Sequence, residues 1–555
     1  MALAEHARLM AALQRPGALP GGMGPAGPVT LVETHLSSLL LAGDRVYKLK
    51  KPRRLAFVDF STLALREVAC REELRLNRRT APAIYLAVLP VVQGADGPRI
   101  EATDTAEAAA SAEAAEAARP DAAAEEPTPA APPVIDWALQ MARFDEQQAF
   151  DHLATRGALS AAQVEALALA VVQFQATLQP LPAGLGAPAA TLDTAERNAA
   201  ELYALCRHDP ALAARTDALA RWSAARGRAL APLMAERHAA GRVREGHGDL
   251  HLGNLVWHDG APLLFDAIEF SPTLRQLDTV GDWAFTFMDL LARVGPDLAW
   301  RFASTLVEAA DDHGALPLLP WWAVYRALVR AKVALLGPPG PAADASLSRY
   351  LGVAEALAAL QPLGGARPAP WLVLMLGLSG SGKSAVAQGL VGPLGAVRLR
   401  SDVERKRLFG LGPRDRAPAA LGLYSREATR RTYDRLLALA GQALSGGIGV
   451  VVDAANLRRA ERAAFVDLAR RLGARPVVLA CRAPEPVLRE RIRRRAAAGT
   501  DASDASEDVL ALQQRVAEWP LADEPAPVWW LDTDAPPDEV LRRALALPWG
   551  SESPG

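Results

Sequence analysis

With 555 residues, the chain is too long for a single hydrophobic core, so we expect it to divide into two to four domains. Half of the residues are hydrophobic and 22% are charged, which excludes a fibrous chain, and the net charge of -2 gives no broad basic surface for nucleic acid. No apolar run reaches the ~20 residues of a membrane span and the N-terminus lacks a signal-peptide pattern, so we predict a cytoplasmic protein.

The first β structure is predicted on either side of a low-complexity stretch. Apolar, strand-like runs cover residues 85–92 and 134–141, while residues 101–133 are rich in Ala, Glu and Pro without apolar periodicity. This composition predicts a disordered acidic insert. Because loop-closure entropy grows slowly with length, the insert can extend a hairpin loop within one domain. Residues 150–245 are alanine-rich with a helical pattern and predict a helical subdomain.

Proline- and glycine-rich breaks at residues 336–341 and 362–370 bracket a helical pattern at about residues 345–360 and indicate a domain boundary. Beyond this boundary, apolar runs alternate with helical patterns. That alternation predicts a parallel sheet covered by helices. The strand-like runs are residues 372–376, 397–400, 448–452, 476–480 and 528–531.

A first constellation of polar residues lies at residues 247–254, which read His-Gly-Asp-Leu-His-Leu-Gly-Asn. Asp249 and Asn254 stand five residues apart on a short loop, and an apolar strand ends twelve residues later at Asp266. A kinase-like phosphotransferase needs one carboxylate to accept the proton of the acceptor hydroxyl, and an amide oxygen and a second carboxylate to hold Mg²⁺. We therefore predict Asp249 as the catalytic base and Asn254 and Asp266 as metal ligands.

Two other interpretations of this loop remain open. His247, Asp249 and His251 alternate along the chain and could face one side as metal ligands. Alternatively, the loop is only capped by its own Asp and His side chains. The metal-site interpretation leaves Asn254 and Asp266 without a role, and both alternatives predict no Mg²⁺-dependent nucleotide binding.

Residues 247–254 and the Phe-Asp-Ala-Ile-Glu-Phe run at 265–270 resemble the catalytic loop and the metal-binding segment of the aminoglycoside phosphotransferase family, which has the protein-kinase-like fold. The resemblance covers about residues 30–335. It implies that a lysine on the third strand of the small lobe binds the α- and β-phosphates of ATP and pairs with a glutamate on the next helix. Lys48 and Lys50 share one strand face, so spacing does not choose between them. We predict the pair Lys48 and Glu72, with Glu67 and Glu73 on the same helix.

A second constellation, Gly-Leu-Ser-Gly-Ser-Gly-Lys-Ser, follows the predicted strand at 371–376 and precedes a helical pattern. This is the context of a P-loop, whose backbone amides cradle phosphates, whose lysine neutralises them and whose serine ligates Mg²⁺. A flexible glycine linker does not explain the lysine. The predicted nucleotide-binding residues are Gly377, Leu378, Ser379, Gly380, Ser381, Gly382, Lys383 and Ser384, of which Ser384 also ligates Mg²⁺.

The scarcity of lysine supports both sites. Arginine has taken nearly every other basic position, and an ammonium is a compact charge that a guanidinium does not replace at a phosphate. The 61 basic residues include only six lysines, at positions 48, 50, 51, 332, 383 and 406, and five of these lie beside the two candidate sites.

Carboxylates follow two strands of the C-terminal part, Asp402 after residues 397–400 and Asp453 after residues 448–452. Strand-end carboxylates in an open parallel sheet face the ligand crevice. We predict that Asp402 activates an acceptor hydroxyl and that Asp453 belongs to the Mg²⁺ site.

About residues 368–545 resemble the small P-loop kinases of the gluconate kinase, shikimate kinase, chloramphenicol phosphotransferase and zeta-toxin group. The resemblance implies lid arginines that close over the transferred phosphate. The basic run at residues 489–495 occupies the lid position, so Arg491 and Arg495 are predicted to contact ATP. A solvated helix face is the alternative.

The expected fold is a mixed α/β and α+β multidomain protein. A protein-kinase-like domain, with a small β lobe and a large helical lobe, is predicted at residues 1–340. A linker follows at residues 341–367, and a P-loop NTPase domain, with a parallel sheet and flanking helices, is predicted at residues 368–555.

These features favour an ATP- and Mg²⁺-dependent phosphotransferase whose two kinase-type domains each phosphorylate a hydroxyl of a small molecule. The first alternative is a nucleotide-sensing regulatory protein without a small-molecule acceptor. The second is a polynucleotide end kinase, which shares the P-loop fold, but the slightly acidic charge balance counts against nucleic acid. We expect no membrane partner, and the sequence leaves the acceptors and the oligomeric state open.

Overall fold

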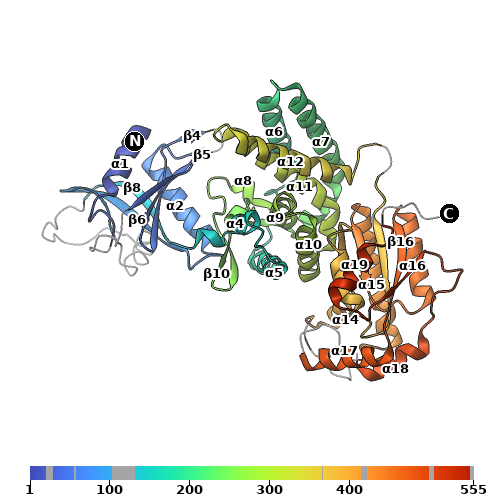
Figure 1. The fold of residues 1–555 in the computed structure, drawn as a ribbon. Coiled ribbons are helices and arrows are strands. Elements are labelled where there is room, and N and C mark those ends of the chain that lie inside the picture. Colours follow the sequence, from blue (N-terminus) through green and yellow to red (C-terminus); the bar gives the residue numbers. More distant parts are fainter. Residues whose placement is uncertain are drawn as a thin grey trace. The chain divides into compact units, whose positions relative to one another are not determined.

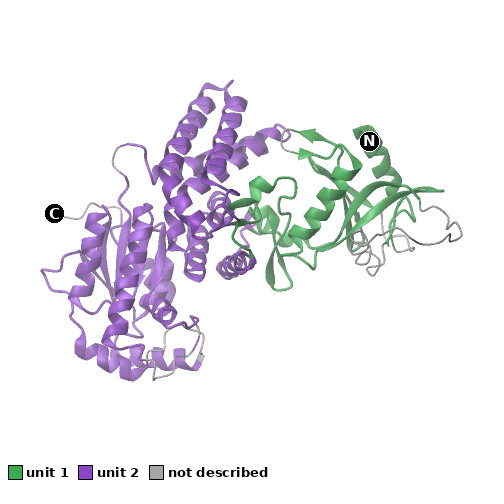
Figure 2. Ribbon diagram, turned by 180° about the vertical axis from the view of Figure 1, so that it is seen from behind, with its two compact units in different colours: residues 1–153, 178–181, 244–277 green, residues 154–177, 182–243, 278–555 purple. Residues whose placement is uncertain are grey.

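The computed structural model describes residues 1–20, 29–55, 58–102, 132–364, 367–413, 415, 422–498 and 506–549. Residues 103–131 of the predicted acidic insert lie outside the described residues. The chain divides into two compact units, drawn in green and purple in Figure 2. Unit 1 comprises residues 1–153, 178–181 and 244–277, and unit 2 comprises residues 154–177, 182–243 and 278–555.

Unit 1 is built on an antiparallel sheet with the strand order β1-β2-β3-β8-β6-β7 (Figure 1, blue). The pairing of β6 with β8 confirms the predicted hairpin, and β7 adds a further strand beside β6. The strands are β1 (Thr30–Glu33), β2 (Ser37–Ala42), β3 (Arg45–Lys50), β6 (Tyr85–Gly94), β7 (Gly97–Ile100) and β8 (Val134–Ala142).

Two helices cover opposite faces of this sheet. Tyr47 and Leu49 of β3 pack with α1 (Leu3–Leu13) in one apolar cluster. The alternate residues of β3, Lys48 and Lys50, face α2 (Leu63–Asn77) and ion-pair with its Glu73. Period-two alternation along the strand therefore places both lysines on the side of α2, as the sequence predicts.

The remaining elements of unit 1 are short. The hairpin of β10 and β11 lies between the predicted catalytic loop and Asp266. The elements are β4 (Arg54–Leu55), β5 (Val58–Asp59), η1 (Glu146–Gln148), η2 (Leu252–Asn254), β10 (Leu255–His258), β11 (Ala261–Leu264) and α8 (Pro272–Arg275). The chain passes between the two units in α4 (Phe150–Thr155), β9 (Val243–Glu245) and β12 (Gln276–Asp278).

The first part of unit 2 is helical, as predicted for residues 150–245. Residues 341–359, which belong to the predicted linker, form α12 and pack on α11, with Tyr350, Leu351 and Ala354 buried. The helices are α5 (Ala161–Thr177), α6 (Pro188–Cys206), α7 (Pro210–Ala239), α9 (Thr279–Arg293), α10 (Pro296–Ala310), η3 (His313–Leu318), α11 (Leu319–Leu336) and α12 (Pro341–Ala359).

The second part of unit 2 is a parallel sheet with the order β14-β15-β13-β16-β17. Each predicted strand is present to within a few residues, and the central strands β13, β15 and β16 are the most deeply buried. The strands are β13 (Trp371–Leu376), β14 (Ala396–Arg400), β15 (Gly449–Asp453), β16 (Arg475–Arg482) and β17 (Val528–Asp532).

Helices flank this sheet (Figure 1, yellow to red). They are α13 (Lys383–Leu390), α14 (Ser401–Leu408), α15 (Arg426–Ser445), α16 (Arg459–Arg471), α17 (Glu485–Ala498), α18 (Glu507–Val516) and α19 (Pro537–Leu545). The predicted fold class is therefore confirmed. Within the described part of the chain, no helix is both long and apolar enough to cross a bilayer.

Two candidate phosphotransfer sites

The lysines of β3 form the centre of the first site, in unit 1. Lys48 Nζ lies 2.7 Å from Glu73 Oε1 and 2.8 Å from Asp266 Oδ1. Lys50 pairs with Glu73 and Glu269, and its side chain is only 2% exposed. Burial by itself would lower the pKa of Lys48, but the carboxylates of Asp266 and Glu73 raise it well above the ordinary value. Lys48 is therefore a stable cation beside the predicted metal ligand.

The predicted partner of Lys48 is wrong by one residue, because the lysine pairs with Glu73 and not with Glu72. The buried positions of α2 recur every three or four residues at 66, 69, 70, 73, 76 and 77, and Glu73 lies on this face. Glu72 is turned by about 100° and pairs with Arg75 at 2.7 Å and with Arg275 at 2.5 Å. Arg275 also donates to the carbonyls of Ile268 and Glu269, so Glu72 helps to fix the segment after Asp266.

The catalytic loop brings together the predicted base and one predicted metal ligand. Asn254 Nδ2 donates to the backbone oxygen of Asp249 at 2.9 Å and to its Oδ2 at 3.1 Å. His251 Nε2 lies 3.5 Å from the same carboxylate oxygen. Since the amide nitrogen of Asn254 is used in this way, its Oδ1 is the atom suited to a metal ion.

The loop does not fit the alternative metal site. His247 Nε2 lies 2.9 Å from the carbonyl oxygen of Phe265, and its Nδ1 accepts from the amide of Asp249. His251 Nδ1 accepts from the amide of Gly253. Both ring nitrogens of His247 are occupied in fixing the loop, and the described residues contain no group of three His, Cys, Asp or Glu side chains arranged for a metal.

Asp266 is held in an unusual backbone conformation, with φ +61°. The hydroxyl of Tyr85 accepts a hydrogen bond from its amide at 3.1 Å, and the amide of Phe265 donates to the carbonyl of Asn254 at 3.0 Å. A left-handed conformation in a non-glycine residue needs such support from its surroundings. Desolvation would raise the pKa of Asp266, but Lys48 lowers it below the usual value, so the carboxylate is charged at neutral pH.

The second site, in unit 2, begins with the P-loop between β13 and α13. Gly380 has φ +81°, and a Cβ there would lie 2.5 Å from the carbonyl oxygen of Leu488. Gly377 would place a Cβ 2.7 Å from the carbonyl oxygen of Cys481. Only glycine fits the backbone at these two positions, which explains the spacing of the motif.

Two predicted Mg²⁺ ligands are in contact at the base of this loop. Ser384 Oγ donates to Asp453 Oδ1 at 3.0 Å. Arg398 Nη1 lies 3.9 Å from the other carboxylate oxygen and donates to the backbone oxygen of Ser384 at 3.2 Å. A hydroxyl and a carboxylate at this separation are the oxygen donors that Mg²⁺ prefers in P-loop proteins.

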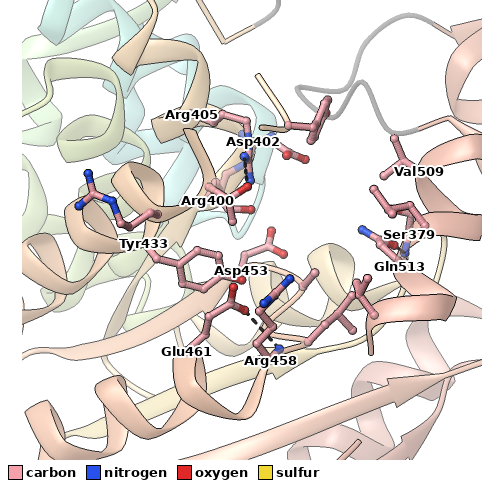
Figure 3. A pocket seen from close by; sticks show the side chains of 18 of the residues that line it. Ser379, Arg400, Asp402, Arg405, Tyr433, Asp453, Arg458, Glu461, Val509 and Gln513 are labelled. Carbon is pink, nitrogen blue, oxygen red and sulfur yellow. Dashed lines mark hydrogen bonds between the residues drawn. The ribbon is translucent and has the colours of Figure 1, made fainter. Parts of the chain in front are cut away.

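A cavity of about 650 Å³ opens beside the P-loop, and several of the predicted residues line it (Figure 3). It is lined by Lys383, Ser384, Asp402, Asp453 and Arg495, together with side chains for which the sequence predicted no role. These include Arg400, Arg405, Tyr424, Tyr433, Arg458, Glu461 and Gln513. Gln513 Oε1 accepts from the amide of Ser379 at 2.8 Å.

The two predicted lid arginines lie in different places. Arg495 lines the cavity. Arg491 donates to the backbone oxygens of Gly380, at 3.4 Å, and Thr533, at 2.8 Å, so its guanidinium fixes the P-loop backbone. One turn of helix α17 separates these two arginines.

Parts of the chain are similar to known proteins. Residues 372–520 match the AAA domain family AAA_33. The uncharacterized protein Rv2004c of Mycobacterium tuberculosis is 30% identical over 532 residues, which are 94% of this chain and 95% of that protein. A sugar kinase from Janibacter sp. HTCC2649 is 23% identical, with a TM-score of 0.25, over 32% of this chain and 93% of that chain. A GDP complex of an aminoglycoside 2′-phosphotransferase is 14% identical, with a TM-score of 0.35, over 64% of this chain and 96% of that chain.

The fold and the family match define the class of the C-terminal part: it is a P-loop domain with a parallel sheet, similar to the AAA_33 family, in which Ser384 of the P-loop contacts Asp453 at a strand end. The chain belongs to the family of the mycobacterial protein Rv2004c, which it matches over nearly its whole length.

Proposed function

We propose that this protein uses ATP and Mg²⁺ in two kinase-type sites and that each site transfers the γ-phosphate to a hydroxyl of a small molecule. The observation that carries the proposal is the cavity in unit 2. There the phosphate-binding Lys383, the Ser384–Asp453 pair and the strand-end carboxylate Asp402 line one space of about 650 Å³. A site that only binds a nucleotide needs Asp453 for Mg²⁺, but it has no need for the further carboxylate of Asp402 in the same cavity.

The residues of unit 1 support the same chemistry. Asp249 is oriented by Asn254 and His251 and is suited to accept the proton of an acceptor hydroxyl. Lys48 is charged and is suited to hold the nucleotide phosphates. Transfer then needs the hydroxyl oxygen to bond to the γ-phosphorus while the bond to the β-phosphate oxygen breaks and ADP leaves.

The donor sets of both sites fit Mg²⁺. Asn254 Oδ1 and Asp266 would hold it in unit 1, and Ser384 and Asp453 would hold it in unit 2. When bound, the ion neutralises charge on the transferred phosphoryl group. The hard oxygen ligands agree with this ion better than with a transition metal.

The test is transfer of label from γ-labelled ATP to a fractionated pool of polar metabolites. Wild type is compared with Asp249→Asn, which removes the base of unit 1, and with Lys383→Ala, which disables the P-loop. We expect two sets of labelled products, each lost in one variant only. Arg45→Ala, at an exposed pair with Asp44, is a control that keeps both products.

Absence of labelled product in the presence of demonstrated ATP binding would contradict the proposal. It would favour the nucleotide-sensing regulator. Label on an oligonucleotide 5′ end that disappears at high salt would favour the end kinase.

A further inference from the structure

Arg405 is a buried cation in the P-loop cavity whose charge is not balanced. Its side chain lines the cavity, yet the residue is only 7% exposed. Nη1 donates to the carbonyl of Leu423 at 2.9 Å and to Thr429 Oγ1 at 3.3 Å, whereas Nε has no partner among the described residues. No carboxylate of the described chain lies within ion-pairing distance of this guanidinium. A buried charge without a counter-ion is costly, so the site is suited to an anion supplied by a ligand.

Arg405 and the predicted base Asp402 are placed so that one ligand can contact both side chains. Asp402 and Arg405 stand three residues apart on α14, so they share one face of the helix, and both line the cavity. Figure 3 shows them together with Arg400 on one side of the cavity. The guanidinium carbon of Arg405 lies 5.1 Å from the ring centroid of Tyr424, which also lines the cavity and restricts its movement.

Arg400 is a second cavity arginine, and helix α10 holds it. Ser304, Glu308 and Asp311 recur at intervals of four and three residues, so they lie on one face of this helix and its C-terminal end. Ser304 Oγ accepts from the amide of Arg398 at 2.9 Å, and Glu308 Oε1 lies 3.3 Å from Arg400 Nη1.

The last residue of this face, Asp311, lies 2.5 Å from Arg435 and 3.6 Å from Arg407. Neither arginine lines the cavity. The helical part of unit 2 therefore supplies a contact to the cavity wall through Glu308, and a neighbouring contact outside the cavity through Asp311.

We propose that Arg400 and Arg405 form a subsite for an anionic group of the acceptor, and that Glu308 is the positioning residue for Arg400. This inference rests on the proposed function of the P-loop site. It narrows the acceptor to a small molecule that carries a hydroxyl for Asp402 and, a few bonds away, a carboxylate or a phosphate. A neutral or cationic molecule would leave Arg405 without a counter-ion.

Binding of inorganic phosphate tests the subsite without catalysis. The full-length protein is first saturated with Mg²⁺–ADP, so that the P-loop is occupied, and phosphate is then titrated by calorimetry. We expect phosphate to bind, and Arg405→Leu to weaken the binding about tenfold or more, as expected for loss of a charge-assisted hydrogen bond. Arg430→Leu is the matched control, because Arg430 lines the same cavity but pairs with Glu427 and Asp434. Equal phosphate affinity in wild type and Arg405→Leu would overturn the subsite.

The role of Glu308 is tested in the same titration. We expect Glu308→Gln to weaken phosphate binding about fivefold, because the ion pair that holds the guanidinium of Arg400 in position is lost. Asp311→Asn perturbs the same helix face away from the cavity and should leave phosphate affinity unchanged. Equal effects of the two variants would mean that α10 only stabilises the fold, and would overturn the positioning role.

A third measurement separates the subsite from the proposed function. The metabolite pool is divided by anion exchange at neutral pH into anions and an unretained fraction, and each is assayed for Lys383-dependent labelling. Labelling among the anions, with the half-saturating amount raised in Arg405→Leu, supports the subsite. Labelling confined to the unretained fraction overturns it. Labelling in neither fraction contradicts the kinase function of this site. The phosphate titration then tests the anion subsite by itself, without reference to catalysis.

Discussion

Lys48 donates to Glu73 and to Asp266 at almost equal distances, 2.7 Å and 2.8 Å. One ammonium thus joins helix α2 to the segment that carries a predicted Mg²⁺ ligand. A nucleotide phosphate with its metal ion would take over part of this interaction, since Lys48 would contact the phosphate while Asp266 would contact the metal. Glu73 keeps Lys50 as a second cationic partner, so helix α2 stays anchored to the strand when Lys48 turns toward a phosphate.

Replacement of Lys48 should therefore remove nucleotide binding from unit 1 without unfolding it. In a Lys383→Ala background, which leaves only the first site, we expect Lys48→Ala to weaken Mg²⁺–ATP binding about tenfold or more, because a charge-assisted contact is lost. Asp249→Asn is the control, since the predicted base faces the acceptor and should leave ATP affinity within about twofold. Calorimetric titration measures both. An unchanged affinity in Lys48→Ala would show that another residue holds the phosphates.

The P-loop should be intolerant of a single methyl group at Gly380. Gly380→Ala would place Cβ 2.5 Å from the backbone oxygen of Leu488 in a conformation with φ +81°, so the loop must move. We expect this variant to lose ATP binding at the second site. Gly473→Ala is the matched control, because it has φ +68° with no atom within 4 Å and should cost only about 1–2 kcal/mol of unfolding free energy. ATP titrations in an Asp266→Ala background compare the two, and retained binding in Gly380→Ala would contradict the close contact.

The P-loop and the strands around it could be predicted because their signals are local. Eight consecutive residues specify the loop, and the buried parallel strands are short apolar runs. The choice of Glu72 failed because the sequence does not mark the buried face of α2. That face includes the polar residues Arg66, Glu73 and Asn77, whereas the apolar Leu65 and Val68 of the same helix are exposed.

The contacts of α10 with the P-loop part could not be predicted in this way. Ser304 and Arg398 are 94 residues apart, and a helical period shows which side chains share a face but not which element that face meets. The same limit applies to α12. Its sequence indicates a helix, but the packing of Tyr350 against α9, where its hydroxyl donates to Asp289 at 2.8 Å, depends on tertiary structure.

A buried ion pair should dominate the stability of the helical part of unit 2. Arg237 of α7 donates to Asp278 and Asp312 at 2.7–2.8 Å, and all three side chains are at most 8% exposed. Arg237→Leu leaves the buried Asp278 without its cation and leaves Asp312 with only the longer contact to Arg242 at 3.7 Å, so we expect a loss of about 3–5 kcal/mol of unfolding free energy. Arg228→Leu on the same helix removes an exposed pair with Glu196 and should cost less than about 1 kcal/mol. Urea unfolding measures both, and equal losses would contradict the role of Arg237.

The buried His313 should make the protein sensitive to mild acid. Burial lowers the pKa of this imidazole to about 4, although Glu404 and Asp311 oppose the shift, and neither ring nitrogen has a hydrogen-bond partner among the described residues. The unfolded chain, with a histidine pKa near 6.5, binds a proton first as the pH falls. The stabilisation is therefore complete above pH 6.5 and is lost as the pH falls from 6.5 toward 4, by about 3 kcal/mol.

His313→Leu should flatten this dependence, because the leucine fills the site without titrating. Unfolding free energies at pH 7, 6, 5 and 4.5 measure the slope. Burial also lowers the pKa of His6, in unit 1, to about 4. His313→Leu therefore keeps a smaller dependence of unfolding free energy on pH, which arises from His6. His208→Leu, at an exposed position, should keep the slope of the wild type. If the His313→Leu and wild-type slopes were equal, His313 would not be a source of the acid sensitivity.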